Sequence, residues 1–253
     1  MNRRDFVKIS TLAAAGSAVG TPFAGQEDSQ EDDDRYDFLL PTVEFHCHNQ
    51  RDDRWNYYPG AHRNLLLEFS SVVRCKIKEP TRCHNNSPRW GDEGNLNAVV
   101  TLEAIEPLRK YPFLFMSAEG PYSLKEEEKE ILGEYLQSGG FLLMDDCIIS
   151  PTGDYFYQSS CKIMEEIFGQ GSVKRIPNSH EIFHNVYDLR DIGLPLGIGE
   201  GTNHGGQGVF IGDRVAVFLS STDIHCGWLY PWNPWYKKSI EMGINIIMYS
   251  LSH

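Results

Sequence analysis

Two short apolar segments joined by one helical segment constrain the fold of this chain more than any other feature. Residues 111–117 and 141–144 are apolar and lack the polar alternation of a half-exposed strand. Between them, Ser123 and Glu126 have the spacing of a capping box, apolar residues follow at helical spacing, and Gly139-Gly140 ends the helix. This order predicts a right-handed βαβ crossover in a parallel sheet covered on both faces.

The rest of the hydrophobic pattern extends this unit into one α/β domain over residues 37–253. The further elements that we expect are a strand at 42–46, a helix with an apolar stripe over 65–73, a helix at 161–168 capped by Ser159 or Ser160 and closed by Gly169, a hairpin of 209–211 and 215–219, and a C-terminal helix with one apolar face over 240–251. A composition that is 41% hydrophobic supplies enough apolar side chain for a packed core.

The N-terminus predicts export. Arg3 and Arg4, followed by Phe6 and Lys8, precede a weakly hydrophobic run that reaches Phe23, which is the order of a twin-arginine signal peptide over residues 1–24. No cysteine follows this run to anchor a lipid, and no later stretch is long and apolar enough to span a bilayer. Residues 25–36 are acidic and predict a disordered linker. We therefore expect a periplasmic or secreted bacterial protein without a transmembrane anchor in its mature chain.

The net charge of the chain limits the classes of partner that we expect. Lys and Arg number 23 against 35 Asp and Glu, which gives a formal net charge of −12. Such a surface repels phosphate backbones, so a nucleic-acid partner is not expected. An envelope protein or a small ligand is the expected partner.

Several segments together resemble the DUF4159 family of uncharacterised bacterial proteins. The segments that carry the resemblance are residues 53–59 leading to 64–66, residues 111–115, 139–147 and 180–184, and the ends 223–228 and 243–249. They extend over roughly residues 38–251, and their joint order is more specific than any single motif. The resemblance implies a fold similar to the class I glutamine amidotransferase superfamily, which is a flavodoxin-like three-layer sandwich, and it implies no established activity.

Asp145, Asp146 and Cys147 follow the second apolar strand of the βαβ unit, where open parallel sheets bind ligands. An active amidotransferase would resemble Gly-x-Cys-x-Gly here, but Asp146 and Ile148 flank this thiol and two carboxylates oppose its ionisation. Glutamine hydrolysis by Cys147 is therefore not expected. The two carboxylates are candidates for acid–base work or for binding a cation, and the alternative is that each caps a loop or a helix.

Histidines form a second candidate site. His46 and His48 lie on one face of a possible strand. The loops that could converge with it contain His180, His184, Asp223, His225 and Cys226. A divalent metal is therefore a possible cofactor, with His46, His48 and His225 as its ligands. No Cys-x-x-Cys or His-Glu-x-x-His spacing occurs, so these histidines have non-metal explanations as well.

Three other features leave alternatives open. Of the six cysteines, Cys75 and Cys83 are the best local candidates for a disulfide, whereas Cys147 and Cys161 resemble core residues. The glycine-rich segment 197–208 lacks a phosphate-loop ending and is interpreted as a mobile loop beside the site. The aromatic segment 228–235 can stack a sugar ring or cover a partner, although plugging the end of the sheet is the commoner role of such a segment.

Two functional hypotheses follow. The first is a non-catalytic binding module on a degenerate amidotransferase-like fold. The second is a periplasmic, hydrolase-like enzyme, with or without a metal. In it, Asp145 or Asp146 exchanges protons with His184, while Asp223, His225 or the pair His46 and His48 hold metal or substrate. Convergence of the aspartates and His184 in one pocket would favour the enzyme, and separate capping roles would favour the binding module.

Overall fold

The computed structural model describes residues 37–47, 55, 59–80, 96, 98–148, 153–197 and 202–253. The expected signal peptide (1–24) and linker (25–36), together with His48 and Cys83, lie outside these ranges. Within them, no helix combines the length and the apolar character that a membrane span requires.

One seven-stranded sheet forms the centre of the fold, in the order β2-β1-β3-β4-β7-β6-β5. Its strands are β1 (Pro41–Glu44), β2 (Ala98–Thr101), β3 (Phe113–Ala118), β4 (Phe141–Asp146), β5 (Val173–Arg175), β6 (Gln207–Ile211) and β7 (Arg214–Ser220). The first five in the sheet order run parallel, while β6 is antiparallel to both of its neighbours. The sheet is therefore mostly parallel, as predicted.

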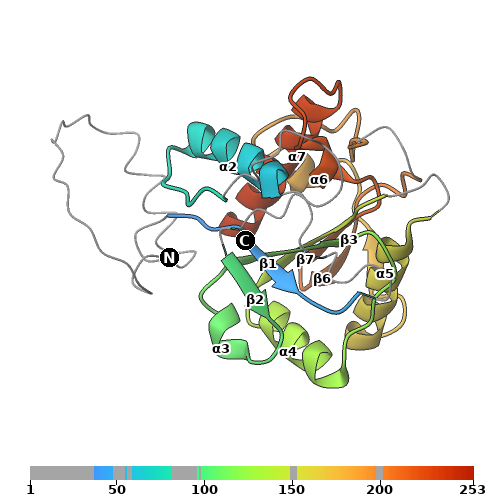
Figure 1. Cartoon of the computed structure of the whole chain (residues 1–253). Coiled ribbons are helices and arrows are strands. Elements are labelled where there is room, and N and C mark those ends of the chain that lie inside the picture. The colour runs from blue at the N-terminus through green and yellow to red at the C-terminus, as the bar shows by residue number, and fades with distance from the viewer. Residues whose placement is uncertain are drawn as a thin grey trace, which may run out of the picture.

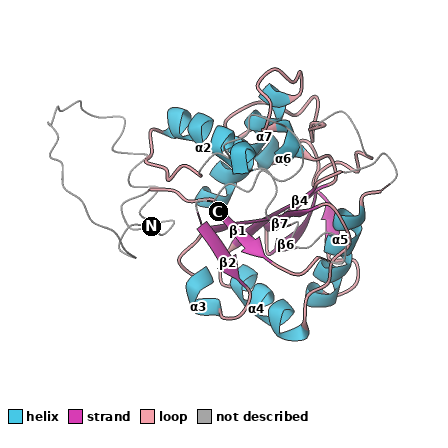
Figure 2. Ribbon diagram, viewed as in Figure 1, coloured by secondary structure: helices cyan, strands magenta, loops and turns pink. Residues whose placement is uncertain are grey.

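Helices cover both faces of the sheet (Figures 1 and 2). They are α2 (Pro59–Val73), α3 (Ile105–Leu108), α4 (Glu126–Gln137), α5 (Tyr155–Phe168), α6 (Ile224–Gly227) and α7 (Tyr236–Ser252), with a 3-10 turn, η2, at Glu181–Phe183. Helices α2, α6 and α7 lie on one face, and α3, α4 and α5 lie on the other. This is a three-layer α/β arrangement of the flavodoxin-like type.

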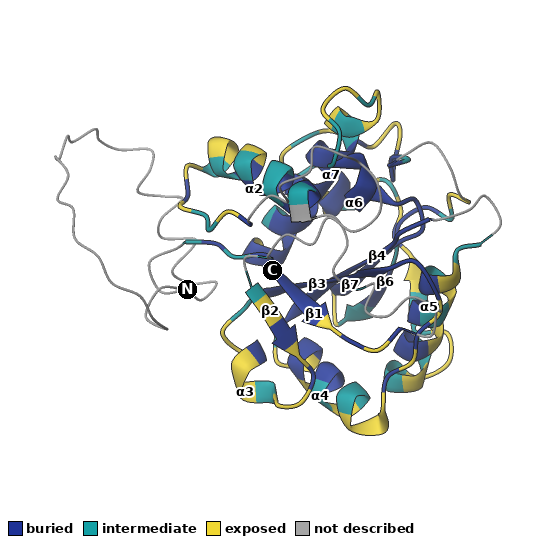
Figure 3. Cartoon of the chain, viewed as in Figure 1, coloured by how far each residue is buried: buried dark blue, intermediate teal, exposed yellow. Residues whose placement is uncertain are grey.

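Alternate side chains of the central strands fill two separate cores. Phe113 and Phe115 of β3 pack with α2 and α7, whereas Leu114 and Met116 pack with α4 and α5. All of these side chains are at most 1% exposed. Because both faces are buried, β3 and β4 contain no polar alternation, and Figure 3 shows the sheet as a buried layer between helices whose outer faces are exposed. The βαβ prediction is confirmed by the parallel pairing of β3 with β4.

Two predicted helix starts and one strand end are wrong. Helix α4 begins after Lys125, whose backbone N–H donates to the Glu128 carboxylate at 2.7 Å, because the chain is still extended at Tyr122, which forms a β-bridge with Cys47. Helix α5 begins at Tyr155, six residues before the predicted start, since its first turn is capped by a distant carboxylate described below. The first strand, β1, ends at Glu44 and not at residue 46.

The hairpin, the C-terminal helix and the Gly169 helix end are confirmed. β6 and β7 pair antiparallel around Gly212, which has the positive φ of 63° that glycine accepts without strain. Helix α7 buries its apolar face against η2, α2 and α6. The carboxyl ends of β4 and β7, which are adjacent in the sheet, position the candidate site between these layers.

Candidate functional site

Asp145 ends β4 and connects that strand to the segment after β7. Its Oδ2 accepts the backbone N–H of His225 at 2.8 Å, and its Oδ1 accepts that of Ile224 at 3.2 Å. The Ser220 side chain, opposite Asp145 in the sheet, is hydrogen-bonded to the same carboxyl group. A fully buried carboxyl group therefore holds the first turn of α6 against the end of β4.

Asp223 caps α6 from the opposite side of the same turn. It has left-handed backbone dihedral angles, φ 55° and ψ 46°, which a short polar residue tolerates better than most. One carboxyl oxygen accepts the Cys226 N–H at 3.2 Å, and the other accepts the Ile148 N–H at the same distance. Asp223 thus ties the segment after β4 to α6.

Asp146 points to the other face and caps α5. Its Oδ2 accepts the backbone N–H of Tyr157 at 2.8 Å, in the first turn of that helix. This contact explains why α5 begins before the serines that the sequence suggested as its cap. Each of the three aspartates therefore satisfies backbone amides, which is the capping alternative that the sequence left open.

Burial makes these carboxyl groups hard to ionise. Desolvation raises the pKa of Asp145 to about 7 and that of Asp146 to about 8, against the hydrogen bonds that oppose the change. The pKa of Asp223 is raised well above its usual value by burial and then by the nearby charge of Asp145. Asp145 and Asp223 therefore both hold a proton more readily than an exposed aspartate does.

Two imidazole rings lie together above the sheet. His225, in α6, is fully buried against Phe115 and Trp228, and its ring centroid is 5.0 Å from that of His62 in α2. His62 is 2% exposed, and neither of its ring nitrogens has a hydrogen-bond partner within the described part of the chain. Burial, and then the proximity of His225, lowers the pKa of His62 well below 6.5, so its ring is neutral at pH 7.

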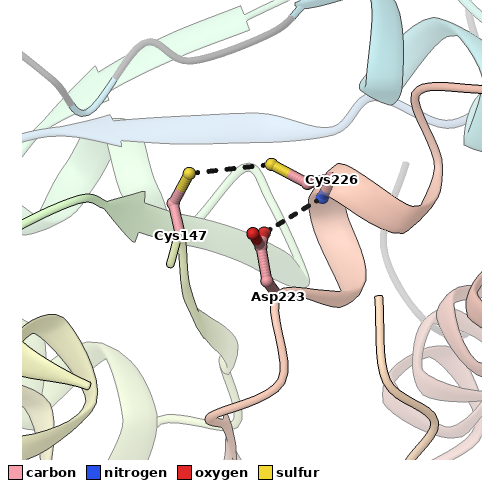
Figure 4. A group of neighbouring side chains, drawn as sticks. All are labelled: Cys147, Asp223 and Cys226. Carbon is pink, nitrogen blue, oxygen red and sulfur yellow. Dashed lines mark hydrogen bonds between the residues drawn. The ribbon is translucent and has the colours of Figure 1, made fainter. Parts of the chain in front are cut away.

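The structure gathers two groups of potential metal ligands around Asp223. Asp145, Asp223 and His225 form one group, and Cys147, Asp223 and Cys226 form the other. In each group, one ligand atom from every residue lies within 4.8 Å of the others, and all of the residues are buried. Figure 4 shows the second group, in which both thiols and the Asp223 carboxyl group face a common space.

The remaining predicted residues lie elsewhere. His184 follows η2, where its Nε2 lies 3.2 Å from the carbonyl oxygen of Ser179, and it belongs to neither group. His46 is exposed beyond the end of β1, and His48 is outside the described residues. Asp145, Asp223 and His225 are thus brought together, whereas His184 and His46 do not join them.

The aromatic segment after α6 divides into a buried part and an exposed part. Trp228 is fully buried, and its Nε1–H donates to the Ser239 carbonyl at 2.8 Å. In contrast, Trp232 is 78% exposed and stacks on Tyr230, with ring centroids 5.0 Å apart and an interplanar angle of 28°. The expected plugging role applies to Trp228, and Trp232 and Trp235 lie on the surface.

Comparison with known families identifies the family of this chain. Residues 45–251 match the family described as Domain of unknown function (DUF4159). The chain belongs to the DUF4159 family. A search of curated proteins found no match. The match covers most of the chain, and the family description names no activity. The chemistry of this chain is therefore inferred from its site residues.

Cys147 of this DUF4159 domain is not arranged as an amidotransferase nucleophile. The contact with Cys226 acts to lower its pKa, but burial and the Asp223 carboxyl group outweigh that contact and raise the pKa to about 12. A thiol of this kind carries almost no thiolate at neutral pH, in agreement with the absence of glycines beside it.

Gly197, the first residue of the glycine-rich segment, lies directly against the site. Gly197 donates its N–H to the Thr222 carbonyl at 2.7 Å, and a Cβ at Gly197 would lie 1.6 Å from the Asp223 carbonyl oxygen. Only glycine fits this approach. The location beside the site agrees with the sequence interpretation, and the chain leads into β6 and not into a helix.

The sequence pattern does not predict two features of the DUF4159 site. Cys226 lies in a loop that is expected to converge on the site, but its contact with Cys147 spans 79 positions of sequence and leaves no local signal. His62 is not among the predicted site residues, although its spacing of three and four residues before Leu65 and Leu66 places it on the buried stripe of α2. That helical spacing was the available signal.

Proposed function

We propose that this protein is exported and that its DUF4159 domain binds a neutral glycan in the cell envelope without catalysing a reaction. The observation that carries the proposal is the exposed stack of Tyr230 and Trp232 on the segment that follows α6. Aromatic faces of this kind bind the apolar faces of sugar rings. The net charge of −12 disfavours an anionic polymer as the ligand.

The aromatic stack is held in a fixed position. Asn64 of α2 donates to the carbonyl oxygens of Trp228 and Leu229 at 2.9 and 3.0 Å, and the Asn233 N–H donates to the Tyr230 carbonyl at 2.8 Å. The Trp235 N–H donates to the Asn233 side chain at 2.9 Å. A preorganised aromatic surface loses little conformational entropy on binding, which supports a recognition role.

The absence of catalysis is supported by the roles of the strand-end residues. Asp145, Asp146 and Asp223 accept backbone N–H groups of α6 and α5, and they hold structure together. Cys147 lacks the glycine elbow and the ionisable thiol of an amidotransferase. We interpret the domain as a degenerate form of the amidotransferase-like fold.

Export is part of the proposal and rests on the paired arginines at positions 3 and 4 and on the small, weakly apolar residues that follow them. An exported protein meets the glycans of the envelope directly, which suits the proposed ligand class.

A metal-assisted hydrolase is the second candidate. The buried group of Asp145, Asp223 and His225 favours it, because carboxylate and imidazole ligands suit a catalytic divalent cation. In this candidate Asp145 or Asp146 would work with His184, whose ring Nε2 lies 3.2 Å from the Ser179 carbonyl oxygen.

Binding is tested by co-sedimentation of the mature protein with insoluble chitin and cellulose, two uncharged polysaccharides. We expect retention of the native protein by at least one polymer and a loss of about tenfold or more in affinity for Trp232→Ala, which removes one stacked ring. Ile192→Ala, at another exposed apolar side chain (49%), is the matched control and is expected to bind normally. Equal retention of native and Trp232→Ala protein, or no retention by any polymer, would overturn the proposal.

A further inference from the structure

Two buried thiols from distant parts of the chain face each other at the carboxyl end of the sheet. Cys147 follows β4 and Cys226 lies in α6, and their Sγ atoms are 3.6 Å apart (Figure 4). Cys147 is 3% exposed and Cys226 is 8% exposed. The Asp223 carboxyl group completes the set, with one of its oxygens within 4.8 Å of both sulfur atoms.

The sulfur separation matches a shared metal ion better than a covalent bond. Two thiolates bound to one tetrahedral zinc ion at 2.3 Å are separated by about 3.8 Å. A disulfide requires a sulfur separation of about 2.05 Å, which these two residues do not have. The observed separation of 3.6 Å is therefore close to that of two thiolates bound to one metal ion.

The surroundings favour a cation independently of the thiols. Asp145 and Asp223 are fully buried close to each other, and neither forms an ion pair within the described part of the chain. His62, also buried, has two ring nitrogens without a described hydrogen-bond partner beside the ring of His225. A cation beside two neighbouring carboxylates offsets their mutual repulsion, and an ion is one explanation for a buried imidazole without a hydrogen-bond partner.

We propose that Cys147, Asp223 and Cys226 bind one thiophilic divalent cation of the zinc class. Thiolate ligands select zinc over magnesium or calcium, which prefer oxygen ligands. On binding, the two S–H bonds break, two sulfur–metal bonds and one bond from an Asp223 carboxylate oxygen form, and the two thiol protons, with the Asp223 proton where that group is protonated, leave to solvent without any change of oxidation state. This ligand set differs from His46, His48 and His225, and it does not depend on the proposed glycan binding.

The bound ion clamps α6 to the end of β4. Helix α6 leads within a few residues to Tyr230 and Trp232, so the ion would also stabilise the base of the exposed aromatic segment. Without the ion, α6 would be held to the end of β4 by the hydrogen bonds of Asp145 and Asp223 alone.

The test uses the mature native protein with Zn²⁺ and Co²⁺ as probes. We expect about one equivalent of zinc after purification without chelators, and a thiolate-to-cobalt charge-transfer band after exchange with Co²⁺. Cys147→Ser and Cys226→Ser are each expected to lose the band and most of the zinc. Cys75→Ser, at another buried thiol (6% exposed), is the matched control and is expected to keep both.

The native protein alone can overturn the proposal, whether or not the variants fold. A Co²⁺-loaded native sample without a thiolate charge-transfer band would overturn it. An intact mass two hydrogens lower, with Cys147 joined to Cys226 and no bound zinc, would overturn it in favour of a disulfide. A band that persists in both serine variants would assign the metal to other residues.

Discussion

The Asp145 carboxyl group accepts the backbone N–H of His225 at 2.8 Å, across 80 positions of sequence. This bond joins the end of β4 to α6, and both residues are fully buried. Asp145 therefore holds the backbone of α6 in place, as Asp146 does for α5.

Replacement of Asp145 by alanine is expected to destabilise the domain by about 2–4 kcal/mol, because two buried backbone N–H groups of α6 lose their acceptor. The measurement is the free energy of unfolding from urea denaturation. Asp191→Ala removes an exposed carboxylate and is expected to change stability by less than about 0.5 kcal/mol. Equal effects of the two substitutions would contradict the capping role of Asp145.

Gly197→Ala is expected to cost more than Gly212→Ala. A methyl group at Gly197 would lie 1.6 Å from the Asp223 carbonyl oxygen, so the backbone has to move. Gly212 has open space around it. Alanine there would only have to adopt the positive φ of 63°, which costs about 1–2 kcal/mol. Thermal unfolding of the two variants gives the comparison. A smaller effect at Gly197 would show that the glycine-rich segment does not lie against the site.

His62 predicts a pH dependence of stability. Its folded pKa is lowered by burial, so below pH 6.5 the unfolded chain binds a proton that the folded chain excludes. The contribution of His62 is therefore present above pH 6.5 and is lost as the pH falls. The aspartates with raised pKa values act in the opposite direction, so the comparison has to be made between variants.

The experiment measures the free energy of unfolding at pH 7.5 and 5.5 in the native protein, in His62→Phe and in His46→Phe, which replaces an exposed histidine. We expect His62→Phe to lose less stability than the native protein on acidification, and His46→Phe to behave like the native protein. Identical losses in all three would mean that His62 is protonated in the folded state.

Export is expected to depend on the arginine pair. Arg3→Lys with Arg4→Lys keeps the charge of the N-terminus but removes the pattern of a twin-arginine signal. We expect the precursor to accumulate inside the cell and the mature form to disappear from the periplasm and the medium in cell fractionation. Normal export of the double variant would assign the segment to another route or to no signal at all.

Local sequence pattern predicts those parts of the fold that local residues determine. The strands around 113–118 and 141–146, the hairpin and α7 follow from apolar runs, turn glycines and helical spacing. The start of α5 cannot be predicted in this way, because the residue that caps it, Asp146, lies at the end of β4. A carboxylate that replaces a local serine cap leaves no mark within the helix itself.

One part of the candidate site can be predicted from the sequence, and another part cannot. The location of Asp145 at the carboxyl end of a parallel strand follows from the sequence, since that strand ends where the apolar run ends. The juxtaposition of Cys147 with Cys226 depends on how β7 is inserted beside β4, and the sequence order does not reveal that neighbour. His184 and His225 have similar sequence environments, yet only His225 reaches the buried group.

The most direct test of a binding module without catalysis follows the protein and its ligand in one experiment. The polymer that best retains the mature protein is incubated with it for a day, and both the bound protein and the soluble sugar products are measured by mass spectrometry. The account predicts retained protein, lost in Trp232→Ala, and no soluble products above the polymer alone. Soluble products that form with the native protein and disappear in Asp145→Asn would contradict the account and establish a hydrolase.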